Sequence, residues 1–223
     1  MKRQYLYSLF LVPIVAMRGQ DIIQEVIRND QGLLDRVVYL NITENSYHRI
    51  KEVDFHDNGN KFRSKSFDKT GEVKIIKEWF RNGQIKLEQH FKEGEKNGSW
   101  STWYEDGIKK SEKTYVTGLI HGLVLHWDEK GGLRYQGNFI ADTVTNTSME
   151  NGLITKWFNN GQKKSEQHYR NGKLDGFSNR WYRNGQRLET GKFYNGSGIS
   201  YTWDENGRKI RERMFENGLP SNE

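Results

Sequence analysis

The sequence contains no cysteine and few aliphatic residues. The absence of cysteine among its 223 residues excludes disulfides, thiolate metal sites, cysteine nucleophiles and a lipid-modified N-terminal cysteine. Only 34% of the residues are hydrophobic and the mean hydropathy is −0.94, which leaves little material for a thick globular core. Aromatic residues nevertheless make up 13% of the chain and glycines number 23, a combination untypical of a disordered chain. These proportions indicate short strands, tight turns and a shallow core.

A strong excess of charge of one sign is also missing. The net charge is +6, but residues 1–19 carry Lys2, Arg3 and Arg18 and no acidic residue. The rest of the chain holds 32 basic and 29 acidic residues, a net charge of +3. The overall charge is therefore a weak argument for a nucleic-acid or membrane partner.

The sequence has no long hydrophobic run. The uncharged run at 5–17 falls short of the roughly 20 apolar residues that span a bilayer. A basic start, an apolar middle and a short polar exit are typical of a secretory signal, which predicts removal of 1–19 and a mature N-terminus at Gln20. We therefore expect an exported bacterial protein, periplasmic, outer-surface or secreted. The alternatives are a cytoplasmic protein with a buried N-terminal strand and a protein anchored in the membrane by its N-terminus.

A short unit recurs along the rest of the chain. Glycines at positions 59, 83, 107, 131, 161, 185 and 207 are spaced by 24, 24, 24, 30, 24 and 22 residues, the signature of a repeat architecture. An aromatic residue stands four positions before each glycine: Phe55, Trp79, Trp103, Trp127, Trp157, Trp181 and Trp203. Another stands eight positions after it: Phe67, Phe91, Tyr115, Phe139, Tyr169, Phe193 and Phe215. We name these the tryptophan column and the phenylalanine column.

The repeated glycines predict turns between strands. Most of them follow Asn or Asp, and Asn-Gly and Asp-Gly supply the positive φ angles of tight hairpin turns; among these are Gly83, Gly107, Gly161, Gly185 and Gly207. Each copy is predicted to be strand, tight turn, strand, looser turn. The predicted fold is all-β, with tandem β-hairpin repeats forming an elongated, twisted single-layer antiparallel sheet. Residues 55–223 hold about seven copies, and residues 20–54 form an N-terminal cap or a degenerate repeat.

The repeat resembles a known family. Segments of the form Gly-x-x-x-x-Trp, followed by the glycine turn and a Tyr or Phe, are similar to the bacterial variant of the membrane occupation and recognition nexus (MORN) repeat; they run from Gly98 to Trp103, Gly122 to Trp127, Gly152 to Trp157, Gly176 to Trp181 and Gly198 to Trp203. The resemblance implies a MORN-like sheet. Bacterial proteins with similar repeats include YwqK-type antitoxins and membrane-binding proteins, so the resemblance implies one of these functions. A repeat, however, identifies architecture rather than function.

The period is broken at two junctions. Six extra residues lie within 140–151, and their Thr, Asn and Ser content predicts a solvated loop, either functional or neutral. The junction at 196–198 is two residues short.

The search for reactive groups predicts no catalytic, cofactor or metal site. The six histidines show no metal-ligand spacing. Glutamates five positions after the repeat glycine, at 88, 112, 166 and 212, are expected to form cross-strand ion pairs, with paired carboxylates as the alternative. Trp103, Trp157 and Trp181 are expected to be buried anchors, which disfavours stacking on nucleic-acid bases.

The predicted function is a non-enzymatic scaffold that binds a protein or another envelope component after export. Two alternatives stay open. One is an antitoxin-like protein that neutralises a toxin by direct contact, and the other is a peripheral membrane-binding protein.

Overall fold

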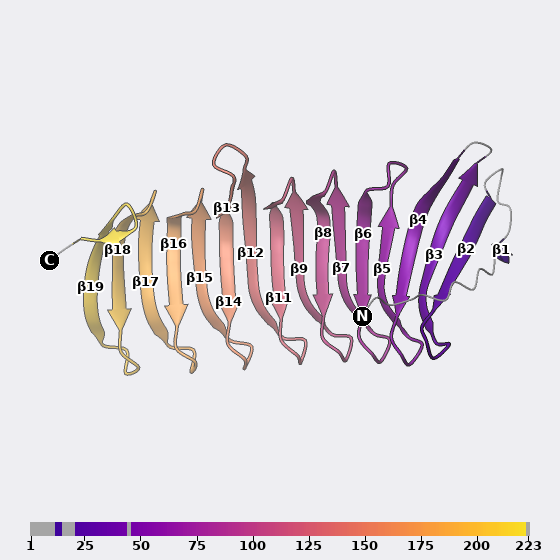
Figure 1. Ribbon diagram of the computed structural model, residues 1–223. Helices are drawn as coiled ribbons and strands as arrows, with labels where there is room; N and C mark the ends of the chain where they lie inside the picture. The colour runs from indigo at the N-terminus through magenta and orange to yellow at the C-terminus, as the bar shows by residue number, and fades with distance from the viewer. Residues whose placement is uncertain (1–11, 15–20, 44–45, 222–223) are drawn as a thin grey trace. The chain divides into compact units, whose positions relative to one another are not determined.

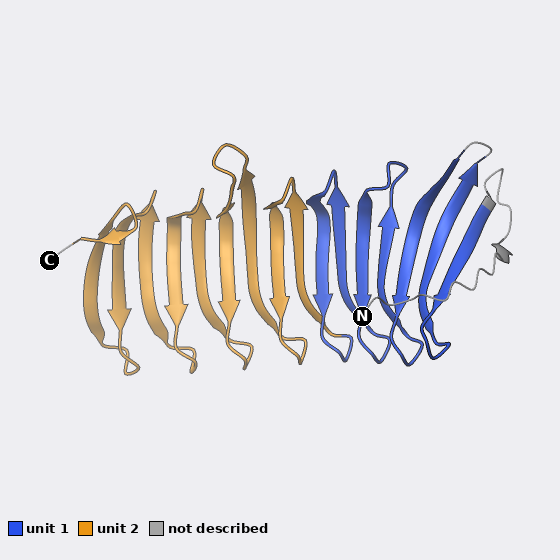
Figure 2. Cartoon of the chain, in the orientation of Figure 1, with its two compact units in different colours: residues 1–107 blue, residues 108–223 orange. Residues whose placement is uncertain are grey.

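The computed structural model describes residues 12–14, 21–43 and 46–221. All regular secondary structure in that part is β-strand. No helix in the described part is long and apolar enough to cross a membrane. The chain divides into two compact units, Met1–Gly107 and Ile108–Glu223 (Figure 2). The expected signal segment lies outside the described residues except for Val12–Ile14, which pair with 22–24.

The strands of the first unit are β1 (Val12–Ile14), β2 (Asp21–Arg28), β3 (Leu34–Thr43), β4 (Ser46–Phe55), β5 (Lys61–Phe67), β6 (Val73–Trp79), β7 (Ile85–Lys92) and β8 (Glu95–Trp103). Those of the second unit are β9 (Lys109–Val116), β10 (Leu119–Ile120), β11 (Gly122–Trp127), β12 (Leu133–Asp142), β13 (Thr147–Glu150), β14 (Gly152–Trp157), β15 (Lys163–Arg170), β16 (Lys173–Trp181), β17 (Arg187–Tyr194), β18 (Ser197–Trp203), β19 (Lys209–Glu216) and β20 (Leu219–Pro220).

Each unit is a single antiparallel sheet in which strands follow one another in chain order (Figure 1). The predicted fold of tandem β-hairpins in one layer is confirmed. Strands β2, β3 and β4 are also paired antiparallel in chain order, and the Asn29–Leu33 turn has the same closing hydrogen bonds as the repeat turns.

The two kinds of turn are the reverse of the prediction. At the repeat glycines the loop is three residues long: Phe80 N–H donates to Gln84 O at 2.8 Å, Gly83 N–H donates to Phe80 O at 3.0 Å, and only Gly83 has a positive φ, +89°. The second connection is the tighter one, because Asn171 and Gly172 form a two-residue loop with φ of 49° and 77°. Two consecutive positive φ angles match the twist of the flanking strands, whereas a three-residue loop needs one.

The difference between 24-residue and 22-residue copies is a bulge. In β15 and β16, Gln167 pairs with Ser178 but Tyr169 pairs with Leu174, so β16 carries two extra residues around Gly176, whose φ is +120°. The short junction lacks the bulge, and β17 pairs with β18 without a register shift from Glu189 to Tyr194. The two-residue deletion at this junction therefore removes the bulge, whereas the two-residue turn at Asn195 and Gly196 is kept.

Side chains of adjacent copies tie the repeat turns together. Asn82 Oδ1 accepts from Gln84 N–H at 2.9 Å, while Asn82 Nδ2 donates to Glu105 O in the next copy at 2.8 Å. Asn58 and Asn160 donate to the equivalent carbonyls, those of Arg81 and Arg183.

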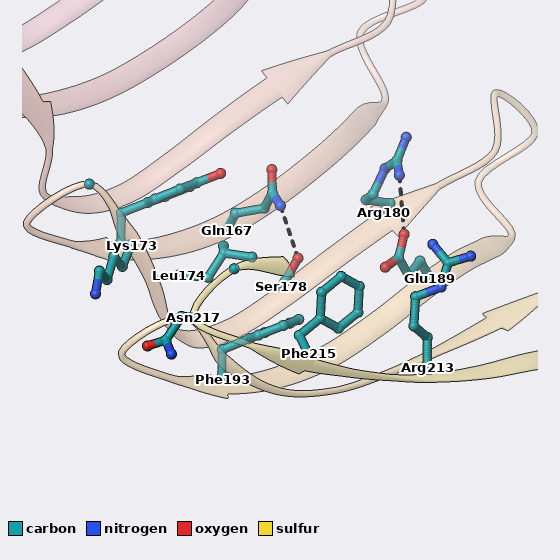
Figure 3. A pocket seen from close by; sticks show the side chains of 14 residues that line it. Gln167, Lys173, Leu174, Ser178, Arg180, Glu189, Phe193, Arg213, Phe215 and Asn217 are labelled. Atoms are coloured by element: carbon teal, nitrogen blue, oxygen red, sulfur yellow. Dashed lines mark hydrogen bonds and ion pairs between the residues drawn. The ribbon is translucent and has the colours of Figure 1, made fainter. Parts of the chain in front are cut away.

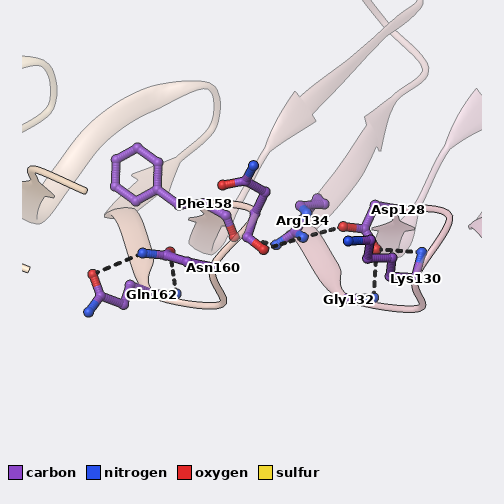
Figure 4. A network of polar contacts seen from close by, with 8 residues as sticks. Asp128, Lys130, Gly132, Arg134, Phe158, Asn160 and Gln162 are labelled. Carbon is purple, nitrogen blue, oxygen red and sulfur yellow. Dashed lines mark hydrogen bonds and ion pairs between the residues drawn. The ribbon is translucent and has the colours of Figure 1, made fainter. Parts of the chain in front are cut away.

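In the copy around Gly131, which has no asparagine before its glycine, an arginine makes the link to the next turn (Figure 4). Lys130 precedes the repeat glycine there, and Asp128 Oδ1 closes the turn by accepting from Lys130 N–H at 3.0 Å and Gly132 N–H at 2.8 Å. Arg134 pairs with Asp128 and donates to the carbonyls of Phe158 and Asn159 in the next copy, the latter at 3.1 Å. The link between successive turns is therefore kept by a different residue type.

Candidate functional site

A groove lies on one face of the second unit, across strands β15 to β19 (Figure 3). Its volume is about 510 Å³, within the range of ligand pockets. The residues that line it are Gln167, Tyr169, Gly172, Lys173, Leu174, Ser178, Arg180, Glu189, Phe193, Gly196, Arg213, Phe215, Asn217 and Gly218. We name this side of the sheet the groove face.

The phenylalanine column forms one wall of the groove. The rings of Phe193 and Phe215 meet edge to face with centroids 5.5 Å apart, and Phe193 is only 6% exposed. Phe193 lies opposite Gly176 on one side and Gly198 on the other. A strand glycine leaves room for a neighbouring ring to cover the backbone, which explains why this aromatic and the glycine of Gly-x-x-x-x-Trp recur together.

Small and neutral polar side chains form the floor. Ser178 is 4% exposed and lies opposite both Gln167 and Gly191 in the sheet register. Gln167 Nε2 donates to Ser178 Oγ at 3.0 Å, so this buried hydroxyl has a partner.

The other wall is charged. Arg180 on β16 and Glu189 on β17 form an ion pair at 3.1 Å. Arg213 on β19 is an exposed lining residue on the same side, whereas Lys173, also exposed, lines the opposite end of the groove beside the β15–β16 turn (Figure 3). The groove therefore combines an apolar wall with a wall that carries more positive than negative charge.

The tryptophan column lies on the opposite face. In β14, Ile154 and Gly152 share the groove face, so Trp157 points the other way because side chains alternate along a strand. The expectation that Trp103, Trp157 and Trp181 are buried is wrong, since each is half-buried. A single-layer sheet has no second layer to cover these rings, and neighbouring long side chains do so only in part, as where Lys61 Nζ lies 5.6 Å from the Trp79 ring centroid.

The other predicted column residues contribute to a shallow core. The remaining tryptophan-column members are half-buried, and in the phenylalanine column only Tyr115 and Phe193 are buried, at 8% and 6% exposed. The most buried side chain of the second unit is Ile154, at 1%. Sequence reasoning missed this position because it holds Val124, Ile154, Ser178 and Ser200 in successive copies, with no common residue type.

A second cluster lies on the groove face of the same unit. The rings of His126 and Tyr135 stack with centroids 5.3 Å apart, and Lys156 Nζ lies 6.0 Å from the Tyr135 centroid. Burial lowers the pKa of His126, helped by the nearby Lys113, and His126 Nε2 is buried without a hydrogen-bond partner. Burial raises the pKa of Tyr135 to about 12, with smaller contributions from Glu150 and Tyr169.

The recurring glutamates do form ion pairs, but mostly not across strands. Glu88 lies 3.0 Å from the cross-strand Lys77 and 3.0 Å from His90 Nε2. Glu112, Glu166 and Glu212 each lie 2.8 Å from the lysine three positions earlier on their own strand. At Lys163 and Lys209 a bulge brings the lysine and the glutamate to the same face. No group of three or more His, Asp or Glu able to hold a metal occurs in the described ranges.

The insertion is an ordered hairpin and not an open loop. Strand β12 extends to Asp142 and pairs with β13, and Ser148 Oγ accepts from Ile120 N–H at 2.8 Å. At its tip Val144 is 93% exposed. The hairpin is a second place where the scaffold offers a distinctive surface.

The fold is a scaffold of tandem β-hairpin repeats, with a groove on one face of its second unit. The MORN repeat variant family matches residues 72–93, 96–117 and 150–171, so the chain contains MORN repeats in these three segments. No curated protein matches the chain significantly. Among solved structures, a chain of "Crystal Structure of TcdB2-TccC3-Cdc42" aligns at 11% identity over 87% of this chain and 14% of that one, with a TM-score of 0.19. So low a score carries no argument.

Proposed function

We propose that this repeat scaffold is non-enzymatic and binds another protein through the groove of its second unit, after export from the cytoplasm. The observation that carries the proposal is the recess itself, in which the buried Phe193 and the half-buried Phe215 face a charged wall. Binding sites commonly join an apolar surface to a few polar groups that set orientation.

The chemistry of the groove supports binding rather than reaction. Its carboxylate, Glu189, is engaged by Arg180 at 3.1 Å, and its hydroxyl, Ser178, accepts from Gln167. A nucleophile needs an adjacent base, and a general acid or base needs a perturbed environment. The described groove residues provide neither arrangement.

Two phenylalanines on opposite faces provide a matched test. Phe215 lines the groove, whereas Phe177 is 59% exposed on the other face of the same unit. Full-length chains carrying Phe215→Ala or Phe177→Ala are used to capture proteins from the envelope fraction, and affinity is then measured with the purified captured protein. We expect Phe215→Ala to weaken binding and Phe177→Ala to leave it unchanged, with thermal melting as the check on folding.

Four results contradict the proposal. The first is unchanged affinity in a folded Phe215→Ala chain, and the second is loss confined to Phe177→Ala. Binding of the purified chain to phospholipid vesicles without any captured protein favours the peripheral membrane alternative. A captured toxin that the chain neutralises in the cytoplasm favours the antitoxin-like alternative.

Export has its own test. N-terminal sequencing of the protein from native cells is expected to read from Gln20, because residues 1–19 have the pattern of a signal segment. An intact Met1 in the soluble cytoplasm contradicts this part of the proposal.

The inserted hairpin is the second candidate surface. Deleting six residues, 143–148, restores the 24-residue spacing and removes the exposed Val144. A folded deletion variant that loses the captured protein while Phe215→Ala retains it would move the site from the groove to this hairpin.

A further inference from the structure

We infer that the groove recognises an extended acidic peptide segment in which an apolar side chain stands between two carboxylates. The inference rests on the proposed function, since it names the kind of protein segment that would enter the groove. It is carried by the charges of the lining residues, their spacing across the sheet and the burial of the rings between them.

The charge of the groove is complementary to an anion. Lys173, Arg180 and Arg213 line it, against the single acid Glu189, which is already paired with Arg180. In the described part of the chain neither Lys173 nor Arg213 has an ion-pair partner, and both are exposed. Arginine presents a planar fork of donors that matches a carboxylate, so Arg213 can bind an incoming acid without first breaking an ion pair.

The spacing of the two arginines sets the length of the segment. Arg180 lies on β16 and Arg213 on β19, three strand steps apart. At about 4.8 Å per step the two positions are about 14 Å apart across the sheet, and Arg213 is also offset by two residues, about 6.6 Å, along the strands, so their backbones are about 16 Å apart. Arginine side chains that lean toward each other shorten this separation to about 13 Å, the length of four residues of extended chain at about 3.3 Å each. Two acids with three residues between them therefore span the groove.

The aromatic wall selects what lies between the acids. Phe193 is 6% exposed and its ring meets Phe215 edge to face, so these rings can contact a side chain that enters the recess. They are not open platforms on which a nucleic-acid base could stack. A flat membrane surface would need apolar groups that project, and here the rings are recessed. An aliphatic or aromatic side chain from an extended peptide fits this wall.

The test uses two labelled peptides and the full-length chain. One contains Asp-Leu-Phe-Leu-Asp and the other Asn-Leu-Phe-Leu-Asn, and binding is followed by fluorescence anisotropy. We expect the aspartate peptide to bind about tenfold more tightly, and the preference to shrink as salt is raised. The variant Arg213→Gln should remove most of the preference. The control Arg187→Gln, an exposed arginine whose guanidinium lies 5.8 Å from the Trp203 ring centroid on the opposite face, should preserve it.

Each other outcome overturns the inference. Equal binding of both peptides would show that the carboxylates are not required. Equal effects of the two arginine variants would show that the preference for acids does not come from the groove. Binding to phosphatidylserine vesicles that depends on Arg213, with neither peptide bound, assigns the charge to a membrane. If the acidic preference is absent but Phe215→Ala still weakens capture of the protein partner, the ligand chemistry is wrong while the proposed function stands.

Discussion

The ring of Phe193 lies directly over the backbone of Gly191, two residues earlier on the same strand. A Cβ placed on Gly191 would come within 2.5 Å of Phe193 Cε2 and within 2.9 Å of Ile199 O. Gly191 does not have the positive φ of the turn glycines, so its requirement is for space and not for backbone conformation. The missing side chain at one position thus makes room for the wall of the groove.

Gly191→Ala is therefore expected to destabilise the second unit by about 1–3 kcal/mol, because the added methyl group must displace a buried ring or the backbone of β18. The control is the same substitution in a Phe193→Leu chain, which lacks the ring carbon nearest to the added methyl group. Denaturant unfolding compares the loss of stability in the two backgrounds. An equal loss in both would show that the Phe193 ring moves aside at little cost.

Ile154→Ala should lower the free energy of unfolding by about 2–5 kcal/mol, because Ile154 is 1% exposed and its removal leaves a cavity. The adjacent Leu153→Ala removes a similar side chain from the other face, where Leu153 is 38% exposed. Its effect should stay near the half kcal/mol typical of surface positions. A larger loss for Leu153→Ala than for Ile154→Ala would mean that the tryptophan-bearing face carries the core.

Arg134→Met should cost about 1–3 kcal/mol, because it leaves Asp128 without its cation and the Phe158 and Asn159 carbonyls without their donor. Arg134→Lys keeps the charge but loses the fork, so an intermediate loss is expected. The control is Lys130→Ala, since Lys130 contributes its backbone N–H to the turn. Thermal melting decides the order, and a harmless Arg134→Met would show that the turns hold without this link.

Stability should fall as the pH rises between about 10 and about 12. Burial raises the pKa of Tyr135 from 10.0 to about 12, so the folded chain keeps a proton that the unfolded chain has lost in this window. Below pH 10 both states are protonated, and the effect disappears. Unfolding measured across this range should show a smaller decline for Tyr135→Phe. The comparison is Tyr194→Phe, at a 76% exposed site, and equal slopes for the two variants would assign the pH effect elsewhere.

The repeat was readable in the sequence because its causes are local. Turn glycines recur where the backbone needs a positive φ, as at Gly83 (+89°) and Gly161 (+84°), and aromatic residues recur at fixed distances from them. Each hairpin pairs neighbours in the chain, so the period alone predicted an antiparallel sheet of tandem hairpins. The kind of turn was less accessible, since Asn-Gly occurs in both connections and only the φ of the asparagine separates them: Asn171 is at 49°, while Asn160 is not positive.

The tertiary structure decided which side chains share a face of the sheet, and with it the groove and the burial of each ring. A bulge between β14 and β15 changes the parity of the alternation, so the sequence could not tell that Trp157 and Tyr169 lie on opposite faces. The groove gathers residues from Gln167 to Gly218 that share no motif and meet only through strand register. The single layer likewise left Trp181 half-buried, because the covering of a ring depends on the side chains that neighbouring strands place beside it. The sequence by itself determined the repeating hairpin, since turn conformation and strand pairing act between near neighbours; register and burial, which act between copies, were decided only in the folded sheet.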